Sequence, residues 1–286
     1  MKLRAPQRIL LDPIHPNVGV AVWYQHELLR LLKAMTWDVQ TTMLNCYPKD
    51  LTQDAPITKT IESNIAELAK RWQRIFDHAA QTLPSTLTGR ILRHHDLAFR
   101  TVLDKAGFSV RFQMTPTMVE AMDEKVRDNV DLIKSIPRQH LDEVEAMTRE
   151  SISKGRNMKE YTEQLQHRFG VAKKRAELIA RDQNNKASAL FHKVRQLGLG
   201  LDKAAWAHTA ASKVPRPEHE EWGAEGKVYD VAQGMLSEDT VAGGPGYVWP
   251  GSEINCACSD RTIIPGYDDE EGASMPDFAE TVSQEE

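Results

Sequence analysis

Residues 171–197 read VAKKRAELIARDQNNKASALFHKVRQL, and they are the most informative stretch of the chain about its architecture. Apolar residues recur in it at intervals of three and four, which is the spacing of one face of an α-helix; they are Ala176, Leu178, Ile179, Leu190, Phe191, Val194 and Leu197. The polar run 181–185 interrupts this pattern. We expect Arg181 and Asp182 to face the loop 206–219 of a second domain, because half-buried charges need partners. Asn184 is expected on a solvated helix face.

The chain before this helix shows the same periodicity. Further helices are predicted over 18–43, 58–80, 91–106, 116–135, 137–153 and 157–169. Thr115 followed by Pro116 has the pattern of an N-cap and a first-turn proline. Residues 1–16 hold three prolines and are expected to be irregular, and 107–114 is expected to include a short extended piece.

The chain after Gly198 has a different composition. Glycine, proline and tryptophan become more frequent, and residues 204–208 and 227–231 have the pattern of short strands. We therefore predict a mainly α protein with a small α+β C-terminal domain and an elongated N-terminal helical region. The expected division is a helical region over 1–155, a C-terminal domain over 156–267 and a disordered acidic tail over 268–286.

Composition and charge narrow the class of protein. The 286 residues carry a net charge of −5, and no apolar run approaches the roughly 18 residues that cross a bilayer. Three cysteines and no signal-peptide pattern argue against a secreted, disulfide-bonded protein and for a cytosol-like compartment.

The charges are unevenly distributed along the chain. Residues 151–216 carry 14 basic and 5 acidic side chains, and residues 217–286 carry 2 basic and 17 acidic. Two interpretations stay open: the blocks neutralise each other in the fold, or the basic block binds an anionic partner such as double-stranded DNA. The DNA-binding candidates are Lys173, Lys174 and Arg175, expected at the start of a helix, with Lys193 and Arg195.

Two segments near the C-terminus carry reactive side chains. The loop 206–226 contains His208, Lys213, Arg216 and His219, residue types that bind phosphate or transfer protons. A nuclease-like enzyme using these four residues is the alternative to a structural protein. No phosphate-binding glycine loop, nucleophile elbow or HExxH motif occurs, so no catalytic mechanism is predicted.

The second segment, 249–261, reads WPGSEINCACSDR. A disulfide between Cys256 and Cys258 would close a strained ring. The two thiols, together with His219, instead suit a structural zinc ion, and we expect these three residues to lie close together. No other cofactor is expected.

These segments resemble the phage Mu F-like family of minor head proteins. The resemblance rests on three motifs, Leu178–Asp182, Arg216–Pro217–Glu218–His219 followed by Gly226, and Asn255–Cys256–Ala257–Cys258. Weaker similarity covers 15–19, 70–72 and 132–137. The chain departs from the family pattern at Ala257, where arginine is usual, and at 212–214, where many members have an acidic residue.

The resemblance implies a head morphogenesis protein of a tailed bacteriophage, not an enzyme. Such a protein is present in few copies in the virion, at the capsid interior or portal vertex, after assembly in the host cytoplasm. Its implied partners are the portal protein, a capsid or scaffold protein and packaged double-stranded DNA, with which it leaves at ejection; no membrane is involved. Arg181, Asp182, Arg216, His219, Asn255, Cys256 and Cys258 are the residues that the motifs single out.

Overall fold

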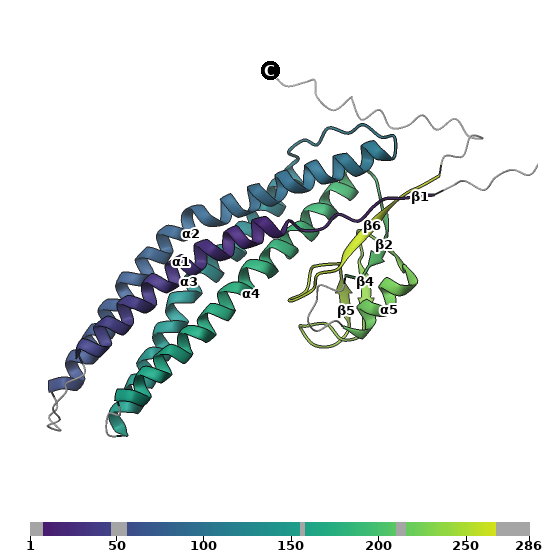
Figure 1. The fold of residues 1–286 in the computed structure, drawn as a ribbon. Helices are drawn as coiled ribbons and strands as arrows, with labels where there is room; N and C mark the ends of the chain where they lie inside the picture. The colour runs from purple at the N-terminus through teal and green to yellow at the C-terminus, as the bar shows by residue number, and fades with distance from the viewer. Residues whose placement is uncertain (1–7, 47–55, 155–157, 210–215, 267–286) are drawn as a thin grey trace, which may run out of the picture.

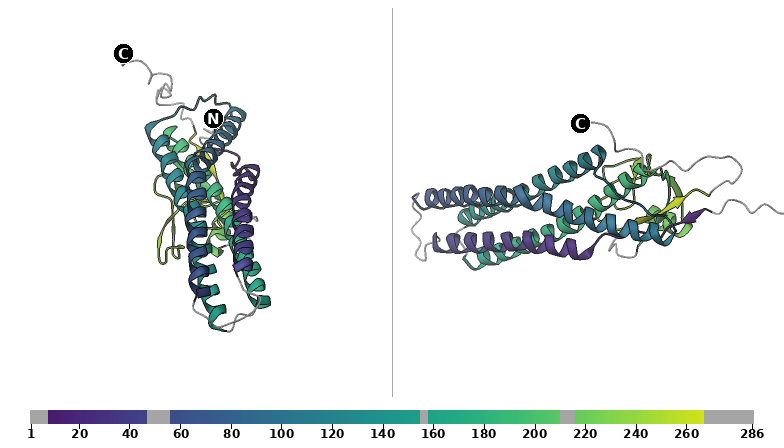
Figure 2. Two further views of the ribbon diagram at one scale, coloured as in Figure 1. Left: turned by 90° about the vertical axis from the view of Figure 1, so that its left-hand side faces the viewer. Right: turned by 90° about the horizontal axis from the view of Figure 1, so that it is seen from above.

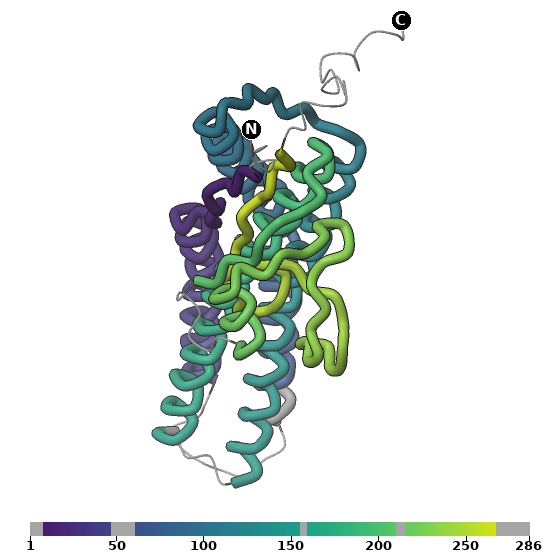
Figure 3. The backbone as a smooth tube through the Cα atoms, turned by 90° about the vertical axis from the view of Figure 1, so that its right-hand side faces the viewer, coloured from purple at the N-terminus to yellow at the C-terminus, as the bar shows by residue number. Residues whose placement is uncertain are grey.

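The computed structural model describes residues 8–46, 56–154, 158–209 and 216–266. Most of this part of the chain is an elongated bundle of four long helices, α1 (Val18–Cys46), α2 (Pro56–Lys105), α3 (Pro116–Ser153) and α4 (Met158–Gly198) (Figures 1 and 2). A small domain containing the strands lies against one side of this bundle (Figure 3). The predicted fold class, mainly α with a small α+β domain, is confirmed.

One hydrophobic core holds the four helices together. Its fully buried side chains come from every helix and include Tyr24, Leu68, Phe76, Ile133 and Phe191. Apolar residues recur at helical spacing in each helix, so each presents a continuous stripe to the others. No helix within the described residues is apolar over a length that would cross a bilayer.

The helices are longer than the sequence predicted. The helices expected over 58–80 and 91–106 are one helix, α2, which continues through Pro84. In the same way α3 continues through Pro137, and α4 continues through Gly170. A proline inside a helix costs about 3 kcal/mol. Burial of apolar side chains on both sides of each proline offsets this cost, because breaking the helix would expose them.

The start of α3 agrees with the sequence. Thr115 is the N-cap, with its hydroxyl oxygen accepting a hydrogen bond from the Met118 amide at 3.2 Å, and Pro116 begins the helix. The preceding segment 108–115 belongs to no strand, so the extended piece predicted over 107–114 is not part of a sheet.

The small domain is built on a four-stranded antiparallel sheet with the strand order β1-β6-β2-β3. The strands are β1 (Ile9–Leu10), β2 (Lys203–Ala207), β3 (Val228–Asp230) and β6 (Ser259–Ile264). A two-stranded sheet, β4 (Met235–Ser237) and β5 (Gly246–Val248), and the short helix α5 (Pro217–Glu225) complete the domain. The predicted strands at 204–208 and 227–231 correspond to β2 and β3.

The two parts of the fold share chain segments. Residues 1–16 were expected to be irregular, yet Ile9 and Leu10 pair with Ile264 and Ile263 of β6 and make β1 an edge strand. The predicted boundary at 155 is not a boundary in packing, because α4 buries residues such as Tyr161 and Phe191 in the bundle core. The change in composition at Gly198 marks the end of α4 and of the bundle.

Candidate functional site

A cluster of two thiols and two imidazoles lies inside the small domain. The Sγ atom of Cys256 is 3.6 Å from Nδ1 of His219, and the Sγ atom of Cys258 is 3.9 Å from the same nitrogen. Nδ1 of His208 is 3.5 Å from Sγ of Cys258. Cys256, Cys258 and His219 are buried and His208 is half-buried. The expected proximity of His219 to both cysteines is therefore present, and His208 joins them.

The strand register brings these residues together from distant parts of the sequence. Ala207, the last residue of β2, pairs with Ser259, the first residue of β6. His208 and Cys258 are the next residues beyond this pair, so they leave the sheet side by side. The hydroxyl of Thr209 donates to the Ala257 carbonyl at 2.8 Å and continues the contact.

Helix α5 supplies His219 by packing closely on the segment that follows β2. A Cβ atom placed on Gly223 would lie 2.3 Å from Cβ of His208 and 2.7 Å from its backbone nitrogen. Only glycine permits this approach. The ring of Trp222 stacks on the His219 ring with 5.3 Å between the ring centroids, and the centroid of the Trp206 ring is 4.8 Å from that of His219. These aromatic rings fix the orientation of the imidazole.

The polar run of α4 holds the loop that carries the cysteines. Arg181 donates from Nη2 to Oδ1 of Asn255 at 2.8 Å, and the Asn255 amide donates to Oδ1 of Asp182 at 3.1 Å. Asn185 donates to the Cys256 carbonyl at 3.0 Å. Asn255 has a φ of 61°, a left-handed conformation that asparagine tolerates better than most residues. The first and third sequence motifs thus contact each other.

Two expectations for this run are met only in part or are wrong. Arg181 and Asp182 both contact Asn255, and Asp182 also pairs with Lys186, whereas the hydrogen bonds and ion pairs of residues 206–209 and 216–219 do not include them. Asp182 is buried, as expected, but Arg181 is exposed. Asn184 was expected to be solvated, but it is 2% exposed and donates to the Asn17 carbonyl at 3.3 Å. The side of the helix that carries these residues packs against the small domain and the N-terminal segment, which periodicity alone does not reveal.

A carboxylate lies behind the cluster. Glu253 is buried, with Oε2 at 3.9 Å from Nε2 of His219 and 3.2 Å from Nε of Arg216. Its other oxygen accepts a hydrogen bond from the Val241 amide at 2.7 Å. Arg216 also donates to the Ile254 carbonyl at 3.2 Å. The second sequence motif is therefore joined to the third through Glu253.

The two thiols differ in acidity. Hydrogen bonding from Cys258, helped by His219, outweighs burial and lowers the pKa of Cys256 to about 4. The pKa of Cys258 is raised, first by its hydrogen bond to Cys256 and then by burial. The Gly251 amide donates to Sγ of Cys256 at 3.3 Å, which also favours a thiolate there. The cluster is thus suited to a positively charged ligand.

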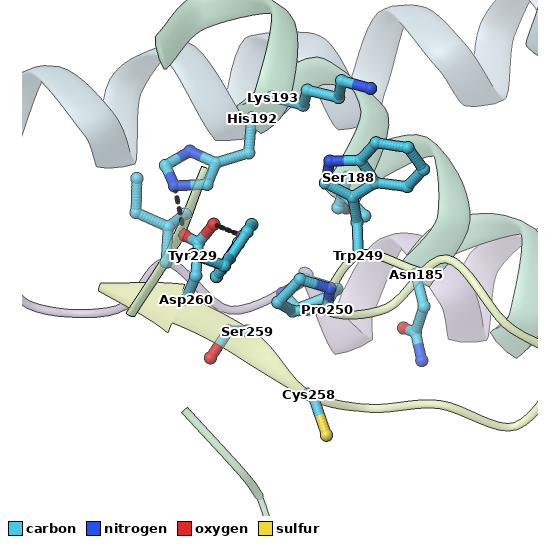
Figure 4. Close-up of a pocket in the computed structure, with 13 residues that line it drawn as sticks. Asn185, Ser188, His192, Lys193, Tyr229, Trp249, Pro250, Cys258, Ser259 and Asp260 are labelled. Carbon is cyan, nitrogen blue, oxygen red and sulfur yellow. Dashed lines mark hydrogen bonds and ion pairs between the residues drawn. The ribbon is translucent and has the colours of Figure 1, made fainter. Parts of the chain in front are cut away.

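A second buried polar network, which the sequence analysis missed, lies between α4 and the sheet. Asp260 is buried, with one carboxylate oxygen 2.7 Å from Nε2 of His192 and the other accepting a hydrogen bond from the Tyr229 hydroxyl at 2.6 Å (Figure 4). Nδ1 of His192 is 2.9 Å from Nε2 of His95 on α2. Alternation along 259–264 could have placed Asp260 on an inward face, but its partners are distant in sequence.

The surroundings within this network shift the pKa values of Asp260 and His95. Burial alone would raise the pKa of Asp260, but the charge and hydrogen bond of His192, with hydrogen bonds from Tyr229 and Gln196, hold that pKa below its usual value. Burial lowers the pKa of His95 to about 4. A cavity of about 30 Å³ adjoins the network, lined by Lys193 and Trp249 among others, and is large enough for about one water molecule. Its size and position suit a structural junction.

The DNA-binding candidates are dispersed. Lys173 and Lys174 are exposed, but they lie inside α4, so the free amides expected at a helix start are absent there. Arg175 is half-buried and donates to the Ser135 hydroxyl at 3.1 Å. Two others are engaged internally. Lys193 lies 3.5 Å above the Trp249 ring, and the buried Arg195 forms a bidentate pair with Asp96 at 2.8 and 2.9 Å.

The nuclease-like arrangement is only partly visible. His208 and His219 turn Nδ1 toward the thiols, and Arg216 is paired with Glu253. Lys213 and the acidic tail 268–286 lie outside the described residues. None of the contacts above favours this alternative.

Comparisons with known proteins agree with the motifs. Residues 142–261 match the family described as Phage Mu protein F like protein. An uncharacterized protein of Haemophilus influenzae is 24% identical over 259 residues, which are 88% of this chain and 55% of that protein. The chain therefore spans about half the length of this curated relative. No solved structure matches the chain.

The matched region begins inside α3 and ends inside β6, so it contains α4, α5 and the whole Cys–His cluster. The resemblance seen in the sequence is confirmed over residues 142–261, which are similar to the Phage Mu protein F like family.

Proposed function

We propose that this chain is a minor structural protein of the phage head, acting in assembly at the portal vertex, with no catalytic role. The observation that carries the proposal is that the side chains of the three motifs contact one another or the residues beside them. Asp182 binds the Asn255 amide, Arg216 binds Glu253, and His219 faces Cys256 inside the small domain. The first of these contacts holds the small domain on the bundle and the other two hold the domain together, which suits a protein that is assembled into a larger particle.

The bundle offers a surface for the proposed portal contact. Trp37 of α1 is 69% exposed, and Leu44, one heptad later on the same helix, is 38% exposed. Exposed tryptophans are frequent among residues that dominate protein interfaces, and their truncation commonly costs 2 kcal/mol or more, about a 30-fold loss of affinity. We therefore expect the portal protein to dock on this part of α1.

The test is co-expression with the portal protein encoded by the same phage, followed by measurement of the affinity. Trp37→Ala should weaken the complex about 30-fold. Leu97→Ala is the matched control, because Leu97 is 64% exposed on α2 at a distance in sequence from this surface, and it should leave the affinity unchanged. Equal binding by both variants would remove α1 as the docking surface, and no complex with the wild-type chain would refute portal association.

Contact with packaged DNA is the second part of the proposal, and it now rests on Lys173 and Lys174. Lys173 has an acidic neighbour, Glu177, at 3.9 Å, so the surface is only moderately basic. The double variant Lys173→Ala, Lys174→Ala should lower the salt slope of DNA binding by about 1.8. Removing the acidic residues after Pro265 should strengthen binding. Lys33→Ala, an exposed lysine of α1, is the control. No binding by the truncated chain at low salt would exclude DNA as a direct partner.

Ejection with the DNA is tested separately on whole particles. Mass spectrometry of purified virions, before and after DNA release, measures the copy number and shows whether the chain leaves the head. We expect few copies per particle and loss on release. A chain that stays in empty heads would restrict its role to assembly.

A further inference from the structure

We propose that Cys256, Cys258, His219 and His208 bind one structural Zn²⁺ ion as a tetrahedral site, with His208 as the fourth ligand. The sequence suggested two thiols and His219 as ligands but offered no fourth. The structure supplies it, because the register of β2 and β6 places His208 beside Cys258. This inference is independent of the role proposed for the protein in the phage head.

The sulfur–nitrogen distances from His219 to both cysteines, and from His208 to Cys258, fit the edges of a coordination tetrahedron. Zinc–sulfur bonds of about 2.3 Å and zinc–nitrogen bonds of about 2.0–2.1 Å at tetrahedral angles place a sulfur and a nitrogen about 3.6 Å apart. Nδ1 of His219 lies 3.6 Å from Sγ of Cys256 and 3.9 Å from Sγ of Cys258, and Nδ1 of His208 lies 3.5 Å from Sγ of Cys258. The ligand atoms of His219, Cys256 and Cys258 all lie within 4.8 Å of one another. Small side-chain movements would close the site on one ion.

The surroundings of His219 support the assignment independently. Nε2 of this ring is buried without a hydrogen-bond partner, while Nδ1 faces both sulfurs. Buried polar atoms that lack a partner are rare and need an explanation. A zinc ion on Nδ1 places the proton on Nε2, which then points toward the Glu253 carboxylate at 3.9 Å. Metal-binding histidines commonly pair with a carboxylate in this way.

The ligand types select the metal. Two thiolates and two imidazoles in a tetrahedral arrangement favour Zn²⁺ over Mg²⁺ or Ca²⁺, which prefer oxygen ligands. All four protein ligands close the coordination sphere, as in structural sites, so no position is left for a catalytic water. His208 is half-buried and the other three ligands are buried, which gives the ion a route from solvent on the side of His208.

The position of the site explains what the ion would stabilise. It would join the end of β2, the start of α5 and the chain that enters β6, three segments of a domain with short strands. The aromatic residues around His219 and the hydrogen bonds from α4 to 255–256 would then fix the cluster on the bundle. Because ligand formation requires the folded domain, binding of the ion is coupled to folding.

The experiment measures metal content and coordination of the full chain, purified under reducing conditions from zinc-supplemented medium. We expect one zinc per chain by elemental analysis. After exchange for Co²⁺, the wild-type chain should show thiolate-to-cobalt charge transfer and the strong visible bands of tetrahedral cobalt. His208→Ala should weaken zinc binding by more than about 100-fold, since loss of an outer partner alone costs about 10- to 100-fold. Glu253→Gln should fall within that smaller range.

Two further variants keep the assignment of His208 falsifiable even if His208→Ala folds poorly. His208→Cys retains four ligands and should keep one zinc, with stronger thiolate-to-cobalt absorption. The controls are His26→Ala, at an exposed histidine of α1, and Cys46→Ser, at a free cysteine of α1. Both should leave the zinc content and the cobalt spectrum unchanged. Unchanged affinity and cobalt spectrum in His208→Ala would exclude His208 as a ligand. A wild-type chain that binds no zinc, or binds an iron cluster instead, would overturn the site.

Discussion

Replacing Asp260 by asparagine tests whether the buried network at the base of the sheet stabilises the junction with the bundle. The carboxylate accepts short hydrogen bonds from His192 and Tyr229, at 2.7 and 2.6 Å, and a longer one from Gln196 at 3.4 Å. Asparagine keeps the shape but removes the charge, and its amide group would meet a donor. A hydrogen bond to a charged group contributes about 1.5–3 kcal/mol. With two short bonds affected, the free energy of unfolding should fall by about 3–5 kcal/mol.

The assay is urea unfolding at pH 7, followed by far-UV circular dichroism, together with hydrogen exchange of the strands. Asp239→Asn, an exposed carboxylate of the same domain, is the matched control and should stay within about 0.5 kcal/mol of the wild type. A loss of 3 kcal/mol in the free energy of unfolding accelerates hydrogen exchange about 150-fold for amides that exchange through the unfolding of this junction. A loss below about 1 kcal/mol, or unchanged exchange of β2 and β6, would refute the idea that this network stabilises the junction.

Two other predictions follow from burial and close packing. Gly223→Ala should lower the free energy of unfolding by about 1–3 kcal/mol, because the new Cβ would lie 2.3 Å from Cβ of His208. Gly170→Ala in α4 should instead raise the free energy of unfolding by up to about 1 kcal/mol, because nothing lies within 4 Å of the new Cβ. Thermal unfolding compares them, and a stabilised Gly223→Ala variant would contradict the close approach. Burial lowers the pKa of His95 and of His140 to about 4. Below pH 6.5 the unfolded chain therefore binds more protons than the folded chain. The free energy of unfolding should fall between pH 6.5 and 4 by up to about 3 kcal/mol for each histidine. Urea titrations across this range measure the slope, which should be shallower in His140→Leu; a flat profile would show that neither histidine is buried in its neutral form.

The sequence predicted the helices well but placed their ends wrongly. Periodicity identified the helical regions because each helix buries one stripe in a shared core. Pro84, Pro137 and Gly170 are local signals for a break, and each was overruled by apolar residues packing on both sides of it. The cost of such a residue is a few kcal/mol at most. Only the tertiary structure shows that the burial lost at a break would exceed it.

The candidate site was predictable where chemistry was local. Cys256 and Cys258 are close in sequence, and the family pattern predicted that His219 lies near them. His208 was noted as a reactive residue but not as their partner, because its place depends on the register between β2 and β6. Arg195 was predicted to contact DNA from its charge alone, whereas its bidentate pair with Asp96 joins residues 99 positions apart. Charge in a sequence does not distinguish a surface from a buried ion pair.

Helix α4 connects the two halves of the molecule, and its polar run shows why a mixed pattern arises. One side of the helix carries Ala176, Ile179 and Phe191 into the bundle core. Its other polar positions bind the loop that carries the cysteines, through Asp182 and Asn185. A helix that must satisfy an apolar core and a polar domain at once cannot show a clean amphipathic pattern. The interruption at 181–185 therefore marks the junction between the bundle and the loop that carries the cysteines.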